Sequence, residues 1–265
     1  MRRATIGVSL KMYLGHQQTL DWTRAVASIA RDHPAVTEGL AELFVLPSFP
    51  DILPVSDILA GTGVRTGAQD LAAEDHGPYT GEVSGAVLRE IGCAFAEVGH
   101  AERRRLFGED DTVVAAKTAA ALRNGLIPVV CVGEPNVCDP EEAADRTVAE
   151  LERILYTTSP GRTFGPVVVA YEPQWAIGAP APASTRHISA VCGALASWIG
   201  SRPELAGSRV IYGGSAGPGL LTRLGADVGG LFLGRFAHRP ESVRQILDEV
   251  LALPDRFRPL GPAAR

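Results

Sequence analysis

Eight short apolar runs, each followed by a stretch with helical periodicity, set the strongest limit on how this chain folds. Apolar runs of this length are typical of parallel strands that are buried on both faces. We expect strands at residues 5–9, 43–46, 64–68, 94–98, 127–132, 167–171, 209–212 and 231–233. Eight β–α alternations in about 250 residues favour an α/β fold, a closed (β/α)8 barrel. An open doubly wound sheet is the alternative.

The later helices carry clear start signals. The segment 139–142 (Asp-Pro-Glu-Glu) combines an N-cap, a proline at the first helical position and two acids that the helix dipole favours. A further helix is expected to begin near Pro240. We therefore predict one barrel domain over residues 1–253, followed by a loosely attached C-terminal tail over residues 254–265, which is rich in Pro and Arg.

The composition of the 265 residues narrows the class of protein. Hydrophobic residues make up 46%, enough for a sizeable core, and the net charge of −5 gives no reason to expect binding to nucleic acid or to anionic membranes. No run approaches the roughly 20 apolar residues that a membrane span needs. The four cysteines form neither a CxxC pair nor a zinc-ligand spacing, so we expect no metal site, reduced thiols and a cytoplasmic protein.

Polar residues follow several of the predicted strands. In a closed barrel these strand ends meet at one rim, so Lys11, His100 and Glu172 are expected to converge there, together with glycine-rich turns at 213–214 and Gly234. A proton on a carbon next to a carbonyl is weakly acidic. Its removal requires a positioned base and stabilisation of the enediolate oxygen, and these residue types supply both.

The sequence around these residues resembles the triosephosphate isomerase family. Matching motifs occur in order at 10–12 (Leu-Lys-Met), 98–104 (Val-Gly-His-Ala-Glu-Arg-Arg), 131–134 (Cys-Val-Gly-Glu), 170–178 (Ala-Tyr-Glu-Pro-Gln-Trp-Ala-Ile-Gly) and 212–215 (Tyr-Gly-Gly-Ser). The resemblance implies a single TIM barrel that isomerises a small phosphorylated sugar without a cofactor or a metal.

The resemblance also implies a role for each residue at the rim. Glu172 is the expected base, His100 the neutral group that hydrogen-bonds the carbonyl oxygens, and Lys11 the cation that offsets the developing negative charge. A helix N-terminus after His100 would keep the imidazole neutral, a tuning for which triosephosphate isomerase is itself the standard example. Glu102 is expected to pair with Lys11 or with an arginine.

Phosphate binding is implied at glycine-rich backbone, where N–H groups approach an anion closely. The matching positions are Gly178, Ser215 and Gly234. The glycines 213–214 serve either this purpose or only tight turns. The segment 173–183 resembles the family's lid, which excludes water from the intermediate, with Trp175 as its rigid anchor.

The sequence departs from the family pattern at six places. They are Ser9, Tyr13, Asp70, Ala101, Ala179-Pro180-Ala181 and Arg235. Ser9 and Ala101 remove bulk or hydrogen-bond donors near the expected sugar. Arg235 either adds a charged contact to the phosphate or points outward in a salt bridge, and Pro180 stiffens a lid hinge. Together the changes favour a branch that acts on four-carbon tetrulose phosphates, such as L-erythrulose 1-phosphate. The triose remains the alternative substrate.

The resemblance implies a homodimer as well. Residues 69–82 match the loop that enters the neighbouring subunit in the family, where Thr80 would brace the partner's site. Two other functions compete with the isomerase. One is a non-catalytic regulatory barrel that binds sugar phosphates. The other is a different phosphosugar barrel, such as an epimerase, which would share only the phosphate loops.

Overall fold

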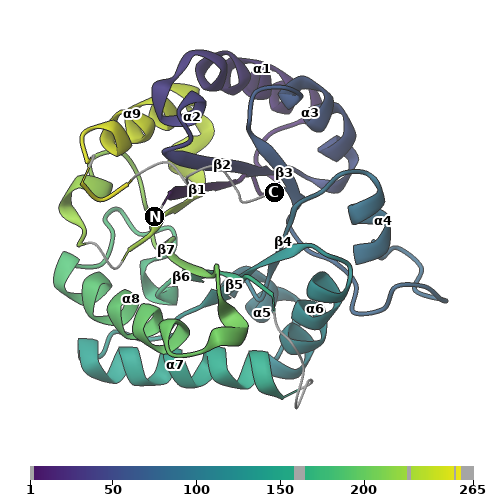
Figure 1. Cartoon of the computed structure of the whole chain (residues 1–265). Helices are drawn as coiled ribbons and strands as arrows, with labels where there is room; N and C mark the ends of the chain where they lie inside the picture. The colour runs from purple at the N-terminus through teal and green to yellow at the C-terminus, as the bar shows by residue number, and fades with distance from the viewer. Residues whose placement is uncertain (1–2, 158–164, 226–227, 254, 258–265) are drawn as a thin grey trace.

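The computed structural model of the chain describes residues 3–157, 165–225, 228–253 and 255–257. Within these residues, eight parallel strands follow one another in sequence order, and the eighth pairs with the first to close a barrel (Figure 1). The closure confirms the predicted (β/α)8 barrel and excludes the open doubly wound sheet, whose edge strands would stay unpaired.

Strands and helices alternate along the chain. The strands are β1 Ala4–Ser9, β2 Ala41–Leu46, β3 Arg65–Ala68, β4 Phe95–Val98, β5 Ile127–Val132, β6 Val168–Tyr171, β7 Arg209–Tyr212 and β8 Gly230–Leu233. The helices are α1 His16–Asp32, α2 Pro34–Thr37, α3 Ile52–Leu59, α4 Gly85–Glu90, α5 Ala101–Phe107, α6 Asp111–Arg123, α7 Pro140–Tyr156, α8 Thr185–Gly200 and α9 Pro240–Leu251. Each predicted strand overlaps an observed one, so the apolar runs identified the barrel correctly.

Aromatic side chains fill the inside of the barrel. Phe44 and Phe95 stack with their ring centroids 4.2 Å apart, and Phe232 lies against Phe44. Gly7 makes room for them, because a Cβ atom there would lie 2.3 Å from Phe44. The interior is therefore a packed core rather than a channel, and a ligand site belongs at the rim.

The predicted helix starts are present. Asp139 caps α7 by accepting a hydrogen bond from the backbone N–H of Glu141 at 2.9 Å, with Pro140 at the first helical position. Helix α9 begins at Pro240 and buries one apolar face made of Val243, Ile246, Leu247 and Val250. Both helices lie in the ring that surrounds the strands in Figure 1.

The end of the chain is more firmly attached than expected where the structure describes it. Phe257 is buried, and Arg256 donates to the carbonyl oxygens of Leu221 and Leu224 at 3.1 and 2.8 Å. The expectation of a loose tail is therefore wrong for residues 255–257, because an apolar ring here reaches the core. The rest of the predicted tail lies outside the described residues.

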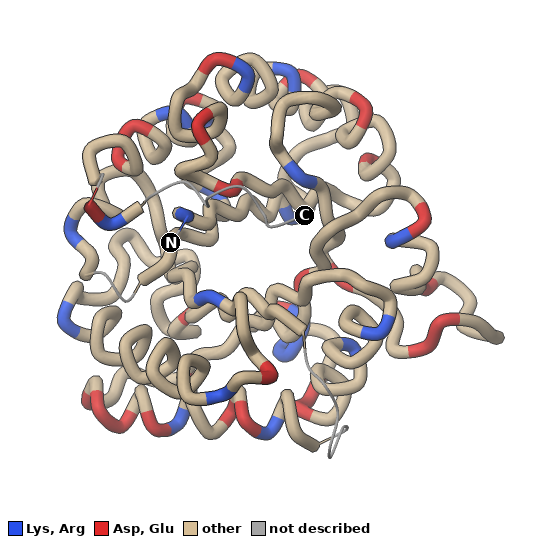
Figure 2. Tube along the Cα trace, viewed as in Figure 1, with Lys and Arg blue, Asp and Glu red and all other residues tan. Residues whose placement is uncertain are grey.

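The outer surface carries both signs of charge, interspersed along the surrounding helices (Figure 2). The segment between β3 and α4 extends away from the barrel beside α4, and Thr80 is exposed on it (Figure 1). Among the described residues, no helix has the length and apolar composition to cross a bilayer, and no group of His, Cys, Asp and Glu is arranged to hold a metal ion.

Candidate active site

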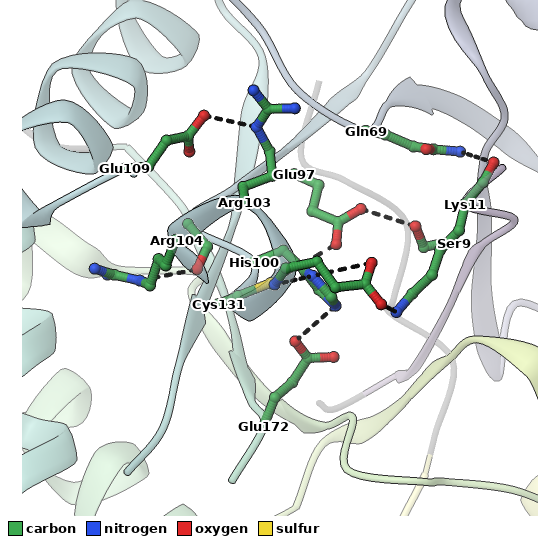
Figure 3. Close-up of polar contacts among 12 residues, drawn as sticks. Ser9, Lys11, Gln69, Glu97, His100, Arg103, Arg104, Glu109, Cys131 and Glu172 are labelled. Carbon is green, nitrogen blue, oxygen red and sulfur yellow. Dashed lines mark hydrogen bonds and ion pairs between the residues drawn. The ribbon is translucent and has the colours of Figure 1, made fainter. Parts of the chain in front are cut away.

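Lys11, His100 and Glu172 meet at the mouth of the barrel, just beyond β1, β4 and β6 (Figure 3). Nε2 of His100 lies 3.5 Å from Oε2 of Glu172, and both side chains are almost completely buried. Lys11 lines the same pocket. The structure thus brings together the cation, the imidazole and the carboxylate that the sequence predicted would converge.

One pocket gathers nearly every predicted site residue. It is lined by Ser9, Lys11, His100, Glu102, Glu172, Gly178, Ser215, Gly234 and Arg235. Thr80 is the exception, since it stands on the exposed segment before α4. Its predicted role toward a partner subunit stays a prediction.

The ring of His100 is oriented by the start of α5. His100 is the N-cap of this helix, and its Nδ1 atom accepts a hydrogen bond from the backbone N–H of Glu102 at 3.0 Å. Because Nδ1 acts as the acceptor, the proton of the neutral ring sits on Nε2. That N–H points toward Glu172 and into the pocket, where it is available to a substrate oxygen.

Lys11 adopts a backbone conformation that side chains rarely take. Its φ angle is +52°, in the left-handed region that costs most residues about 1–2 kcal/mol. Two side chains hold its carbonyl oxygen: Gln69 donates to it at 3.1 Å and Ser48 at 3.3 Å. The backbone is thereby fixed so that the ammonium group enters the pocket and reaches Oε1 of Glu102 at 2.7 Å. Glu102 thus pairs with the first of the two partners expected for it.

Glu172 holds a carboxylate oxygen ready for a ligand. Its Oε2 atom is buried and has no hydrogen-bond partner among the described residues. An unpaired buried carboxylate oxygen is costly, and sites of this kind are found where a proton is to be taken up. Gly213 provides the space, because a Cβ atom there would lie 2.4 Å from Oε1 of Glu172. From the sequence, Gly213 was expected either to bind phosphate or to form a tight turn. The space that it leaves for Glu172 is a third role.

The expected phosphate end of the pocket lies between two loops. Ser215 has a φ angle of +53°, and its Oγ atom is 2.8 Å from the carbonyl oxygen of Ala176 and 2.9 Å from that of Ala179. Arg235 reaches the carbonyl oxygen of Gly178 from the far side at 3.5 Å. Among the described residues Arg235 has no acidic partner within salt-bridge distance, so the structure does not place it in the outward salt bridge considered above.

The segment 173–183 is attached at both ends. Trp175 donates from Nε1 to Oε1 of Glu134 at 2.8 Å, and the backbone N–H of Ala183 donates to the hydroxyl of Tyr212 at 3.0 Å. The anchor predicted for Trp175 therefore has a defined partner in Glu134, which is itself buried. Between the two attachments, Ile177 and Gly178 line the pocket.

The family model for triosephosphate isomerase matches residues 4–250 of the chain. The chain belongs to the triosephosphate isomerase family. The matched range contains every strand of the barrel and all the residues that line the pocket.

Individual family members agree with this assignment. The chain is 52% identical over 252 residues to L-erythrulose-1-phosphate isomerase of Pectobacterium atrosepticum, covering 95% of this chain and 97% of that protein. It is 39% identical over 221 residues to triosephosphate isomerase of Rhodococcus jostii, covering 81% and 83%. The crystal structure of triosephosphate isomerase from Bartonella henselae superimposes with a TM-score of 0.77 at 29% identity, covering 94% and 99%. The chain is accordingly an isomerase of this family.

Sequence reasoning missed one buried acid. Glu97 lies within β4, is 3% exposed, and accepts a hydrogen bond from Oγ of Ser9 at 2.9 Å (Figure 3). Burial raises the pKa of Glu97 to about 7, although the hydrogen bond from Ser9 and the charge of Lys11 oppose the increase. The signal was present in the sequence, since Glu97 is the only acid in the apolar run 93–98.

Ala101 does not border the expected sugar, contrary to the sequence-based expectation. It lines a neighbouring small cavity with Arg104 and Glu150, on the other side of Glu172, which lines both this cavity and the pocket that holds Lys11. Ala101 is the first residue of α5, whereas His100, the N-cap before it, is the residue that lines the pocket. Of the two shortened side chains, only Ser9 faces the pocket.

Proposed function

We propose that this chain isomerises a phosphorylated ketose by moving a proton between two neighbouring carbons through an enediolate. The observation that carries the proposal is the unpartnered, buried Oε2 atom of Glu172 beside Nε2–H of His100 and the ammonium group of Lys11 in one pocket. This arrangement offers a base and two hydrogen-bond donors around a single carbonyl group.

The proposed steps use these residues alone. Glu172 removes the proton from the carbon next to the carbonyl, and the carbon–hydrogen electrons form the carbon–carbon double bond of the enediolate. His100 and Lys11 donate hydrogen bonds to the oxygen on which negative charge develops. The proton of the neighbouring hydroxyl group passes to the former carbonyl oxygen, with Nε2 of His100 as the donor and acceptor between the two oxygens. Glu172 then returns its proton to the former carbonyl carbon, where the electrons of the double bond form the new carbon–hydrogen bond. The carbonyl group has moved by one position and no atom is gained or lost.

For the substrate we propose L-erythrulose 1-phosphate, which this reaction converts to D-erythrulose 4-phosphate. The proton leaves carbon 3 and is returned to carbon 2, and numbering from the other end then gives the product. The 52% identity to an enzyme named for this substrate supports the proposal. Ser9 supports it too, because a small residue at the pocket wall leaves space for a fourth carbon.

Triose phosphates are the second candidate substrate. The identity of 39% to triosephosphate isomerase of Rhodococcus jostii and the same Lys11, His100 and Glu172 constellation favour it. The two substrates share the reacting carbons and the phosphate, and they differ only in the terminal hydroxymethyl group of the tetrulose.

We propose a cytoplasmic homodimer as the working form. Met12 and Tyr79 expose 93% and 48% of their surfaces, and a second copy of the chain would cover such apolar area. Thr80, beside Tyr79, would reach the neighbouring pocket. The free, buried thiols of Cys93 and Cys131 support a reducing compartment.

A substrate panel in deuterated water tests the proposal. L-erythrulose 1-phosphate, dihydroxyacetone phosphate and glyceraldehyde 3-phosphate are each incubated with the protein, and kcat, KM and deuterium incorporation are measured. Turnover of the tetrulose with a higher kcat/KM than the triose, and deuterium at the reacting carbon, are the expected results. A preference for the triose would reverse the substrate assignment. Binding of a substrate without any deuterium exchange would show a non-catalytic sugar-phosphate protein instead.

A further inference from the structure

Ser9 and Glu97 form a buried pair beneath the pocket that the proposed proton transfer does not use. Ser9 ends β1 and Glu97 lies on β4, 88 residues later, yet the hydroxyl of Ser9 donates to Oε2 of Glu97 at 2.9 Å (Figure 3). Both side chains are 3% exposed. A carboxylic acid in this position costs desolvation energy, so its presence calls for a ligand or a partner that an apolar residue would not serve.

The pair lies in the uppermost layer of the barrel interior. Side chains alternate along a strand, so Glu97 faces the same side as Phe95, which is part of the interior cluster. Ser9 likewise faces the same side as Gly7, whose missing side chain leaves space for Phe44. The pair is therefore the polar boundary between the aromatic core below and the pocket above, and Ser9 is the member that lines the pocket.

The direction of this hydrogen bond fixes what Ser9 offers to a ligand. A hydroxyl group has one proton, and in Ser9 that proton is donated to the carboxylate of Glu97. The lone pairs of Oγ that remain can only accept. Ser9 therefore matches a hydroxyl group of a substrate, which donates, and does not match a carbonyl or an ether oxygen.

The position of the pair selects which hydroxyl group this is. Ser9 lines the same pocket as Lys11, His100 and Glu172, so the pair lies beside the reacting groups. Gly178, Ser215 and Arg235 line the part of the pocket where the phosphate is expected. With the phosphate held there and the reacting carbons beside His100 and Glu172, we assign the further carbon of a tetrulose to the wall that Ser9 forms.

We infer that Ser9, positioned by Glu97, accepts the hydrogen bond of the terminal hydroxyl group of a four-carbon ketose phosphate and so sets the chain length of the substrate. The inference rests on the proposed isomerase function. It assigns binding to Ser9 and positioning to Glu97, which does not touch the substrate.

Four variants test the inference. Ser9→Ala removes the acceptor, Glu97→Val replaces the acid with an apolar residue of similar size, and Glu97→Gln keeps an oxygen that accepts the proton of Ser9. Thr5→Val is the matched control, since it removes a buried hydroxyl from the same strand, at the end away from the pocket. The measured quantity is kcat/KM for L-erythrulose 1-phosphate divided by kcat/KM for glyceraldehyde 3-phosphate, at pH 8.

We expect the ratio to fall about tenfold in Ser9→Ala and Glu97→Val, mainly through KM for the tetrulose, because one hydrogen bond to the substrate is lost. Glu97→Gln should retain the ratio within about threefold, and Thr5→Val should leave it as in the wild type. If Glu97→Val does not fold, Ser9→Ala and Glu97→Gln decide the matter. A ratio that stays within twofold of the wild type in Ser9→Ala overturns the inference.

The pH profile separates positioning from a merely structural role. Burial raises the pKa of Glu97 to about 7, and the groups that face it are His100, Glu172, Lys11 and the thiol of Cys131. Protonated Glu97 no longer compels Ser9 to act as an acceptor, so the wild-type ratio should fall between pH 8 and pH 6. The ratio of Glu97→Gln should change less. Equal pH profiles overturn the role of Glu97, whereas a wild type that turns over neither substrate overturns the proposed function itself.

Discussion

The backbone N–H of Glu102 donates to Nδ1 of His100 at 3.0 Å, while the carboxylate of the same Glu102 accepts from the ammonium group of Lys11 at 2.7 Å. One residue thus positions two groups that come from opposite sides of the pocket. His100 and Glu102 are separated by two positions, but Lys11 and Glu102 are 91 positions apart. The ion pair therefore depends on closure of the barrel, which brings β1 and β4 to the same mouth.

Replacing Glu102 should shift the alkaline limb of the activity profile. Burial alone would lower the pKa of Lys11, but the hydrogen bond with Glu102 and the charges of Glu172, Glu102 and Glu97 raise it above its ordinary value. Lys11 must be protonated to act, so activity is lost as pH rises through its pKa. In Glu102→Gln that pKa falls, and the loss should begin at lower pH, with kcat/KM reduced about tenfold at pH 8.

This prediction has an internal control. Glu102→Gln leaves the backbone N–H that orients His100 untouched, so the acid limb should move less than the alkaline limb. Activity measured from pH 6 to about pH 12 covers both limbs, because the pKa of Lys11 in the wild type lies above its ordinary value of 10.5. An alkaline limb that stays in place would show that Glu102 does not set the charge of Lys11.

Shortening Glu172 should impair the proton transfer far more than substrate binding. Glu172→Asp keeps the carboxylate but withdraws it by one methylene group from a pocket in which Nε2 of His100 lies 3.5 Å from Oε2. A misplacement of this size costs about 10²-fold in kcat or more. KM should change by less than about threefold, because the contacts that bind the substrate and the transition state equally are kept.

Glu172→Gln is the matched variant for this prediction. It preserves the shape of the side chain and removes the base, so both kcat and deuterium exchange from solvent should be lost. Steady-state kinetics with exchange monitored by NMR gives both quantities. A kcat within tenfold of the wild type in either variant would exclude Glu172 as the base.

The fold and the three central residues could be predicted because their signals are local. Each strand is an apolar run bounded by turn residues, and Lys11, His100 and Glu172 each come just after such a run. A closed barrel then brings consecutive strand ends together, so sequence order alone places the three side chains at one rim.

Other parts of the site could not be predicted because they depend on packing between distant segments. Glu97 lies within an apolar run, and its partner Ser9 is 88 residues away. The clearance at Gly213 depends on the rotamer of Glu172, which no neighbouring residue reveals. Ala101 was misplaced for the opposite reason: adjacency to His100 suggested proximity to the sugar, but Ala101 begins α5 and lines the neighbouring small cavity instead.

Removing Arg235 should weaken phosphate binding. Arg235 lines the pocket with its guanidinium group near the carbonyl oxygen of Gly178, and a phosphate dianion at this end would lie within its reach. Because Arg235 is partly exposed to solvent, we expect KM to rise about fivefold in Arg235→Ala, with kcat less affected. Arg235→Lys should recover part of the loss, since it retains the charge without the planar fork.

Inhibition by inorganic phosphate provides a second measurement for Arg235. Its inhibition constant should rise in parallel with KM, and the difference from the wild type should shrink at high salt. An unchanged inhibition constant in Arg235→Ala would instead assign the phosphate contacts to the backbone around Ser215 and Gly234.

Lys117 should be required for stability. Its ammonium group is buried between Asp70, at 2.7 Å, and Glu109, at 2.6 Å, and Arg103 also contacts both acids. Lys117→Met leaves two buried carboxylates with a single cation. Breaking a buried ion pair in this way costs about 3–5 kcal/mol in the free energy of unfolding.

An exposed ion pair offers the control for Lys117. Arg244→Met removes a cation that contacts Glu241 and Asp248 on the surface of α9, and water and salt screen such exposed pairs so that they contribute little to the free energy of unfolding. Urea unfolding followed by tryptophan fluorescence gives both values. Equal losses in the two variants would contradict the importance of burial.

Glu97 should lower the stability of the protein at high pH. The pKa of Glu97 is about 7 in the folded chain against an ordinary value of 4.5, because burial disfavours the charged form. Between these two pH values the folded state binds more protons than the unfolded state, so the free energy of unfolding falls as pH rises. The loss is complete above pH 7 and amounts to at most about 3 kcal/mol.

Glu97→Gln should therefore be more stable than the wild type at pH 8, by about 2 kcal/mol, and nearly equal to it at pH 4.5. Burial likewise raises the pKa of Glu150 to about 7. Its contribution to the pH dependence of the free energy of unfolding is the same in both proteins and cancels in the comparison. Urea unfolding at the two pH values measures the difference. Suppose that the variant is more stable at pH 8 and that its ratio of kcat/KM values for the two substrates changes less with pH than that of the wild type. The acid at position 97 then lowers stability while it positions Ser9. A variant that is less stable than the wild type at pH 8 would show that the pair with Ser9 outweighs the desolvation of the carboxylate.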